Sequence, residues 1–259
     1  MLRFSLIVCT RNRPHLLQRL LLGISQLRYL DFELIVIHDP ADAVTTQCLA
    51  HHAAAAKIGH CALANLAKAR NIGLAMAQGE IAAFIDDDAV PEPDWLDQLA
   101  AAYARPEITA VGGVIRARNG IGFQSRAVLI DTFGADHHPT GLPGQLPPDC
   151  FLSLTGTNFS VRREAALTIG GFDENYSYFL EETDFLKRLC EMGGRVCMRE
   201  AAEVHHGTAA SDHRAGNGAP SALRVIARSK AYYCHINQRK EISAATITRA
   251  LARFAMVVR

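Results

Sequence analysis

Three consecutive aspartates are the residues whose type and spacing most suggest chemistry in this sequence. Asp86, Asp87 and Asp88 directly follow residues 81–85, a short apolar run typical of a strand buried on both faces. Adjacent carboxylates repel one another and resist desolvation, and a divalent cation with oxygen ligands is their commonest partner. A turn before a helix N-terminus is the alternative, because Asp and Pro suit both. We expect the aspartates at the carboxyl end of that strand, where open α/β sheets bind ligands.

Two further strand ends carry polar residues that could share this edge. Asp39 follows the apolar residues 32–37, and the polar turn of residues 10–13 follows the apolar residues 4–9. A carboxylate at such a position accepts hydrogen bonds from a base N–H or a ribose hydroxyl, while a metal bridges two phosphates. The three strand ends together predict a nucleotide pocket, although Asp39 alone would be read as an ordinary turn residue and Arg70-Asn71 as a solvated helix face.

A second acidic group, Glu181, Glu182 and Asp184, stands at a predicted helix start. Acids crowded in an otherwise apolar region raise one another's pKa, as a general base requires. Helix capping is the alternative, since negative charge is favoured at a helix N-terminus. His205 and His206 follow a predicted strand and could offer an imidazole to the metal, but either could be an ordinary polar residue.

The elements that must position these side chains alternate along the chain. Apolar runs predict strands, and helical periodicity predicts helices between them, so we expect an α/β fold with a mostly parallel sheet and helices on both faces. Residues 117–150 are rich in Gly, Pro and His and are expected to form a long irregular excursion. The predicted strands are 4–9, 32–37, 81–85, 110–115, 151–161 and 195–198, and the helices include 42–56, 63–78, 96–104 and 163–169.

Composition narrows the class of protein. With 259 residues, 49% hydrophobic residues and a net charge of only +1, the chain fits a globular protein with one core and does not fit a nucleic-acid binder. Seven scattered cysteines without C-x-x-C predict reduced thiols in a cytoplasmic protein. The first apolar run is too short for a signal peptide. Residues 221–259 read as two helices with basic faces, which would pack on the domain, contact the inner face of a membrane peripherally or form a homodimer contact.

The ordered motifs resemble those of family-2 glycosyltransferases with the GT-A fold, over residues 3–207. The matching segments are residues 5–13, 33–39, 69–74, 79–95, 170–174 and 181–185. The resemblance implies a GT-A domain at residues 1–210, with a nucleotide-sugar half at 1–95 and an acceptor half at 96–210, followed by a helical extension at 211–259. It also makes Trp95 and the excursion at 117–150 candidates for the acceptor wall.

The resemblance also implies roles for individual residues on the donor side. Thr10 and Asp39 would contact the nucleotide base, with Arg13, Arg70 and Asn71 beside the donor. Asp86 would reach the ribose, Asp88 would hold Mn²⁺ or Mg²⁺, and Asp87 would lie between them. The family usually has Asp where His38 stands and Gly-Ser near Pro40-Ala41, so the identity of the base stays open.

On the acceptor side, the resemblance places Glu181 and Glu182 at the family's Glu-Asp motif, whose second member is the proposed base, with Asp184 close behind. His205 or His206 falls near a late histidine that often binds metal. The longer Glu182 in place of Asp is compatible with an acceptor slightly further away.

The expected function is an inverting, metal-dependent transfer of one sugar from a UDP- or dTDP-sugar to a hydroxyl of a sugar or lipid-linked sugar, in cell-surface polysaccharide or glycoconjugate synthesis. The absence of Gln-x-x-Arg-Trp favours a single transfer. Two alternatives stand beside it, a non-catalytic nucleotide-sugar scaffold and a sugar nucleotidyltransferase. Residues 9–14 lack the Gly-rich loop that the latter needs, and the missing G-x-G-x-x-G argues against a dehydrogenase.

Overall fold

A computed structural model describes residues 1–50, 56–137, 146–147, 149–176, 178–215 and 221–237. The helices are α1 (Pro14–Ile24), α2 (Ala43–Ala50), α3 (Leu66–Met76), α4 (Trp95–Tyr103), α5 (Arg163–Thr168), α6 (Glu181–Glu191) and α7 (Leu223–Ile236). The strands are β1 (Phe4–Thr10), β2 (Phe32–His38), β3 (Ala56–His60), β4 (Ile81–Ile85), β5 (Ala89–Pro91), β6 (Ile108–Arg116), β7 (Phe123–Ser125), β8 (Val128–Asp131), β9 (Asp136–His137), β10 (Cys150–Ser153), β11 (Asn158–Arg162) and β12 (Arg195–His206).

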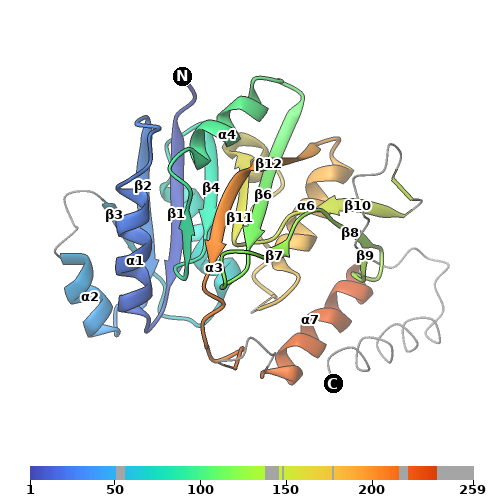
Figure 1. Cartoon of the computed structure of the whole chain (residues 1–259). Helices are drawn as coiled ribbons and strands as arrows, with labels where there is room; N and C mark the ends of the chain where they lie inside the picture. Colours follow the sequence, from blue (N-terminus) through green and yellow to red (C-terminus); the bar gives the residue numbers. More distant parts are fainter. Residues whose placement is uncertain (51–55, 138–145, 148, 177, 216–220, 238–259) are drawn as a thin grey trace.

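One large sheet runs through the middle of the molecule (Figure 1) in the order β3-β2-β1-β4-β11-β6-β12-β5, with β7 paired to β6. The predicted α/β architecture is confirmed. The parallel arrangement holds from β3 to β4, while β11 is antiparallel to both of its neighbours and β12 is parallel to β6. The two reversals around β11 cancel, so β12 ends at the same edge as β1, β2 and β4.

Strand alternation separates the core into two apolar clusters, one on each face of the sheet. On β1, Leu6 and Val8 join the cluster that contains α1 and α4, whereas Ile7 joins the cluster that contains α3 and α6. Both sets are buried, as expected for a sheet covered by helices on both faces. A third, small cluster of Tyr176, Leu180 and Tyr233 joins α7 to the loop before α6.

Several strands differ from the sequence prediction. The predicted helix 42–56 is confirmed only as α2, and the chain then forms the edge strand β3, whose Lys57 and His60 give no apolar signal. The irregular excursion contains β7, β8 and β9, and β8 forms a separate small sheet with β9 and β10. The predicted strand 151–161 is two strands of different sheets, β10 and β11. β12 extends to His206, eight residues beyond the prediction of 195–198. The sequence does not reveal this part of the strand, because charged residues and a register shift between Arg199 and Glu203 interrupt the alternation of apolar and polar side chains.

At the C-terminal side, α7 confirms the first of the two expected helices, and it lies beside β8 and β9 in Figure 1. The second expected helix falls on residues 238–259, outside the described residues. None of the described helices is long and apolar enough to cross a bilayer.

Candidate active site

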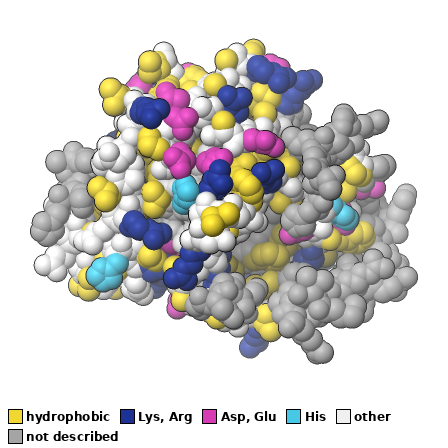
Figure 2. All heavy atoms as spheres, in the orientation of Figure 1, with side chains coloured by type: hydrophobic (Ala, Val, Ile, Leu, Met, Phe, Trp, Pro, Cys, Tyr) yellow, Lys and Arg dark blue, Asp and Glu magenta, His cyan; other side chains and the backbone are white. Residues whose placement is uncertain are grey.

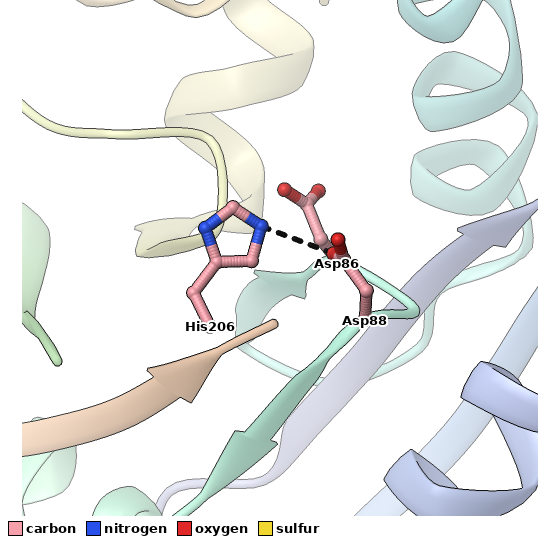
Figure 3. A group of neighbouring side chains, drawn as sticks. All are labelled: Asp86, Asp88 and His206. Carbon is pink, nitrogen blue, oxygen red and sulfur yellow. Dashed lines mark hydrogen bonds and ion pairs between the residues drawn. The ribbon is translucent and has the colours of Figure 1, made fainter. Parts of the chain in front are cut away.

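Three side chains from distant parts of the chain meet at the carboxyl edge of the sheet. Asp86 follows β4, Asp88 precedes β5 and His206 ends β12, and their ligand atoms all lie within 4.8 Å of one another (Figure 3). His206 Nε2 lies 3.1 Å from Asp88 Oδ1. Two carboxylates and an imidazole are a donor set that Mn²⁺ accepts readily, so these residues fit the predicted metal.

The surroundings keep Asp88 charged and His206 in one orientation. Burial by itself would raise the pKa of Asp88, but the hydrogen bond and charge of His206, the Ala209 N–H and Arg13 together lower it below its ordinary value. The Ala209 N–H donates to Asp88 Oδ2 at 2.7 Å. On the other side of the ring, His206 Nδ1 lies 2.7 Å from Gln124 Oε1, which can accept a proton from Nδ1. When a metal replaces the proton on Nε2, this hydrogen bond would hold the ring in the orientation in which Nε2 ligates.

His205 does not join this group. Neighbouring residues of a strand point to opposite faces, and His205 Nε2 instead lies 2.6 Å from Glu92 Oε1. The choice between the two histidines, which the sequence left open, therefore falls on His206.

Asp87, the middle aspartate, is completely buried and binds two side chains of the turn after β1. Its Oδ2 accepts a hydrogen bond from Thr10 Oγ1 at 2.6 Å, and its Oδ1 lies 2.7 Å from Arg13 Nη2. Burial raises the pKa of Asp87 to about 7, although Arg13 and Thr10 favour its charged form. Thr10 and Arg13, predicted to contact the nucleotide, are thus held in place by this carboxylate.

A cavity of about 440 Å³ opens beside this turn, where β1 and β2 end and α3 begins. Asp39 lines it, with Oδ2 on Arg11 Nη2 at 2.7 Å and Oδ1 accepting from the Ala41 N–H at 2.9 Å. Arg11 also donates to the Ala62 carbonyl. Sequence reasoning missed Arg11, and its only signal was a basic residue inside the turn. His38 lies against His60 at the same end of β2, and burial lowers its pKa.

Arg70 connects the group of Asp86, Asp88 and His206, called the metal group below because it could hold an ion, to the acidic start of α6. Its buried guanidinium donates to Glu181 Oε1 at 3.1 Å, and its Nη2 lies 3.7 Å from Asp86 Oδ1. Gly156 leaves room for this guanidinium, because a Cβ there would lie 2.5 Å from Nη2 and would have to displace it. Asn71, the next residue, instead holds the turn at Phe172 by accepting from its N–H and donating to its carbonyl.

Glu181 and Glu182 differ in environment although they are adjacent. Burial, together with the charge of Glu182, raises the pKa of Glu181 to about 8 despite Arg70. Glu182 is only half-buried, and its Oε2 has no hydrogen-bond partner among the described residues. The Gly156 N–H approaches Glu182 Oε1 at 3.4 Å, while the next residue, Thr157, donates to Asp86 Oδ2 at 2.7 Å. One short loop therefore touches both the candidate base and the metal group.

Asp184 points away from this arrangement. Its Oδ2 accepts from Arg188 Nε at 2.8 Å, and Arg188 also donates to the carbonyls of Ile169 and Gly171. Asp184 thus ties α6 to the turn that follows α5.

Trp95 corrects another expectation. It is fully buried in the core, and its Nε1 donates to Asn158 Oδ1 at 2.9 Å, so it cannot form an acceptor wall. Asn158 in turn donates to the carbonyls of Val114 and Ala202, where β6 and β12 lose their register. The indole completes an internal hydrogen-bond network of the sheet.

Comparison with known proteins identifies the family of this chain. Residues 5–169 match the family model "Glycosyl transferase family 2". "O-antigen biosynthesis protein RfbC" of Myxococcus xanthus is 28% identical over 223 residues, which are 80% of this chain and 17% of that protein. "Glucosyl-dolichyl phosphate glucuronosyltransferase" of Haloferax volcanii is 29% identical over 161 residues, 57% of this chain and 50% of that protein. The chain spans half or less of the length of these curated relatives.

Solved structures show the same fold at low sequence identity. The mannosyltransferase PcManGT of Pyrobaculum calidifontis, in complex with GDP-Man and Mn²⁺, superposes with a TM-score of 0.61 at 18% identity, covering 98% of this chain and 75% of that one. TarS residues 1–349 of S. aureus, in complex with UDP-GlcNAc, gives 0.67 at 17% identity, covering 98% and 71%. The architecture is thus the GT-A fold. With the family model spanning most of its sheet, the chain belongs to glycosyl transferase family 2.

Proposed function

We propose that this chain transfers a single sugar from a nucleoside-diphosphate sugar to an acceptor hydroxyl, with metal assistance and inversion at the anomeric carbon. The observation that carries the proposal is the placement of two distinct acidic centres on either side of one loop. Asp86, of the group that can hold a metal, accepts from Thr157 Oγ1, and the half-buried Glu182 lies against the Gly156 N–H. Family membership and the adjoining cavity support the same reading.

Asp86, Asp88 and His206 would hold the ion. A bound Mn²⁺ or Mg²⁺ would neutralise charge on the diphosphate leaving group. The imidazole favours Mn²⁺, because Mg²⁺ prefers oxygen ligands. Arg13 lines the cavity and lies 3.8 Å from Asp88, so its guanidinium is placed to neutralise part of the same diphosphate charge.

Glu182 is proposed as the general base. Glu182 is partly exposed, and its buried Oε2 has no hydrogen-bond partner among the described residues. Its carboxylate would accept the proton of the acceptor hydroxyl while that oxygen attacks the anomeric carbon from the face opposite the diphosphate. Burial and the neighbouring Glu182 raise the pKa of Glu181, so Glu181 is the member of the pair that holds its proton more readily. Single displacement by one base inverts the anomeric configuration.

The donor is proposed to be a UDP- or dTDP-sugar. The Asp39 and Arg11 pair lines the nucleotide cavity and presents both a carboxylate and a planar donor to a base edge. The two solved relatives carry different nucleotides, GDP and UDP, so the fold alone does not choose between bases.

The acceptor is proposed to be a sugar or lipid-linked sugar in cell-surface polysaccharide or glycoconjugate synthesis. One relative is named for O-antigen biosynthesis and another for action on a glucosyl-dolichyl phosphate, which supports this class.

The proposal is tested by measuring release of nucleoside diphosphate from a panel of donor sugars with Mn²⁺. We expect Glu182→Gln and Asp88→Asn each to lower turnover by about 10²-fold or more, because each removes a group acting in the transition state. Asp97→Asn, which changes an exposed aspartate on α4, should leave turnover unchanged. Glu182→Gln should still bind nucleotide. Full turnover in Glu182→Gln would disprove the role of this base, and donor binding without turnover by the wild type would favour a non-catalytic scaffold.

A further inference from the structure

The turn between β6 and β7 exposes apolar side chains close to the proposed reaction centre. Ile121 at this turn is 82% exposed, and Phe123, which starts β7, is 40% exposed. Arginines flank the Phe123 ring, with Arg126 Cζ 3.9 Å and Arg116 Cζ 4.8 Å from its centroid. Arg116 is paired with Glu203, whereas Arg126 has no carboxylate within ion-pair distance among the described residues. Single exposed apolar residues are normal on a protein surface, but apolar side chains next to an unpaired basic one combine the two attractions that hold a protein at an anionic lipid interface.

A second cavity of about 610 Å³ lies between this hairpin and α1. Arg19 and Arg118 line it together with His205 and His206, and no carboxylate is among its described lining residues. In the described part of the chain, neither arginine has a carboxylate within ion-pair distance, and the same holds for Arg126 on the hairpin. Arg19 Nη2 is held by the Asp88 carbonyl. His205 and His206 lie against Glu92 and Asp88, so the charge that this cavity presents next to the exposed apolar turn is that of Arg19 and Arg118.

The hairpin also touches the metal group directly. Gln124 of β7 lies against His206 Nδ1, and Thr208 Oγ1 donates to the same Gln124 oxygen. Figure 2 shows Lys and Arg side chains beside hydrophobic ones, with Asp and Glu side chains next to them, in the middle of the face on which Figure 1 places β7 and the end of β12. Any partner that binds this hairpin would therefore lie at the entrance to the proposed reaction centre.

We propose that the β6–β7 hairpin (residues 117–126) docks on an anionic lipid bilayer, with Ile121 entering the interface and Arg118, Arg126 and Arg19 binding lipid phosphates. Apolar insertion and attraction between basic side chains and anionic lipids add to each other, and each basic residue near the surface contributes about a fivefold gain in binding. Membrane docking is independent of the proposed function. Only its consequence rests on that function: a lipid-linked acceptor would reach Glu182 from the membrane.

Co-sedimentation of the full chain with vesicles, without nucleotide or metal, tests the proposal. We expect binding to phosphatidylcholine vesicles that contain phosphatidylglycerol, little binding to phosphatidylcholine alone, and weakening by salt. Arg118→Glu should lower the partition coefficient by at least about fivefold, and Ile121→Ser should lower it as well. The matched controls Arg28→Glu and Leu30→Ser alter an exposed arginine and an 84% exposed leucine at the opposite edge of the sheet, and should bind like the wild type.

Equal binding of Arg118→Glu, Ile121→Ser and the wild type would overturn the proposal, since another surface would then hold the membrane. Absence of wild-type binding to anionic vesicles at low salt would overturn it too. Insertion can be followed separately in Ile121→Trp, because the one native tryptophan, Trp95, is fully buried. Its added fluorescence should shift to shorter wavelength with anionic vesicles, and an unshifted spectrum in the presence of bound vesicles would contradict insertion.

The outcome is separable from that of the proposed function. Asp88→Asn and Glu182→Gln should bind vesicles like the wild type although their sugar transfer is lost. Conversely, Arg118→Glu and Ile121→Ser should bind nucleoside diphosphate with unchanged affinity, because neither residue lines the nucleotide cavity. A variant that loses both properties would show misfolding, which circular dichroism detects, and the Ile121→Trp measurement then decides the proposal.

Discussion

At the scale of single residues, the charge on the acidic pair at the start of α6 is set by burial. The Glu181 side chain is almost completely enclosed, and its pKa is raised from 4.5 to about 8 by loss of solvent and by the neighbouring Glu182. A carboxyl whose pKa is higher in the folded state stabilises the fold fully below its unfolded pKa, and this contribution is lost as the pH rises through the folded pKa. We therefore expect the free energy of unfolding to fall between pH 5 and pH 8, by about 1 kcal/mol or more.

Chemical denaturation at several pH values measures this effect. Asp87, whose pKa is also raised, contributes in the same direction, so the comparison with Glu181→Gln isolates Glu181. The variant should lose less stability than the wild type over the same interval. Parallel curves for the two proteins would show that Glu181 is ionised throughout.

At the scale of elements, β6 and β12 approach so closely that only glycine fits between them. A Cβ at Gly113 would lie 1.7 Å from the Ala202 carbonyl oxygen, at the register shift bridged by Asn158. We expect Gly113→Ala to lower the free energy of unfolding by about 1–3 kcal/mol or more. Gly122→Ala, whose Cβ would have no neighbour within 3.7 Å, should stay within about 0.5 kcal/mol of the wild type in the same urea titration. Equal stability of the two variants would mean that the strands separate freely at this point.

A second element, α7, supports the loop that presents the glutamates. Phe179 and Leu180 have φ angles of 73° and 69°, a costly conformation for side chains of this size, and Ser229 Oγ donates to the neighbouring Tyr178 carbonyl at 2.7 Å. We expect Ser229→Ala to lower turnover by about fivefold, the value of one neutral hydrogen bond, with little change in nucleotide affinity. The exposed Ser221→Ala serves as the control. Loss of nucleotide affinity equal to the loss of turnover would point to a general defect in folding.

At the scale of the whole molecule, ligand and ion should stabilise the fold together. A ligand that binds only the folded state adds RT ln(1 + [L]/Kd), about 2.7 kcal/mol at a hundredfold excess over Kd, and this corresponds to about 5–10 °C in a chain of this size. We expect the accepted nucleoside diphosphate to raise Tm in the presence of Mn²⁺, and much less in its absence or in Asp88→Asn. A shift independent of Mn²⁺ would separate nucleotide binding from the Asp86, Asp88 and His206 group.

The sequence alone determined the strands that end in polar residues and the order of the family's motifs. It could do so because buried parallel strands are continuous apolar runs, and because parallel strands bring their carboxyl ends to one edge. The positions of Asp86 and Asp88 at the carboxyl end of β4 follow from this pattern alone. Short or charged strands such as β3 and the end of β12 have no such signal, since they lie at edges or carry exposed side chains.

Only the tertiary structure decided what each polar side chain contacts. His206 rather than His205 joins Asp88 because the strand's alternation turns one imidazole inward, across a separation of 118 residues in sequence. Asp87 accepts a hydrogen bond from Thr10 at the end of β1, and Trp95 donates one to Asn158 of β11 in the core. Both partners lie on strands that are distant in sequence, so only the folded sheet shows these contacts. Residue type and spacing along the chain predict local structure, whereas burial and pairing depend on contacts that only the folded sheet creates.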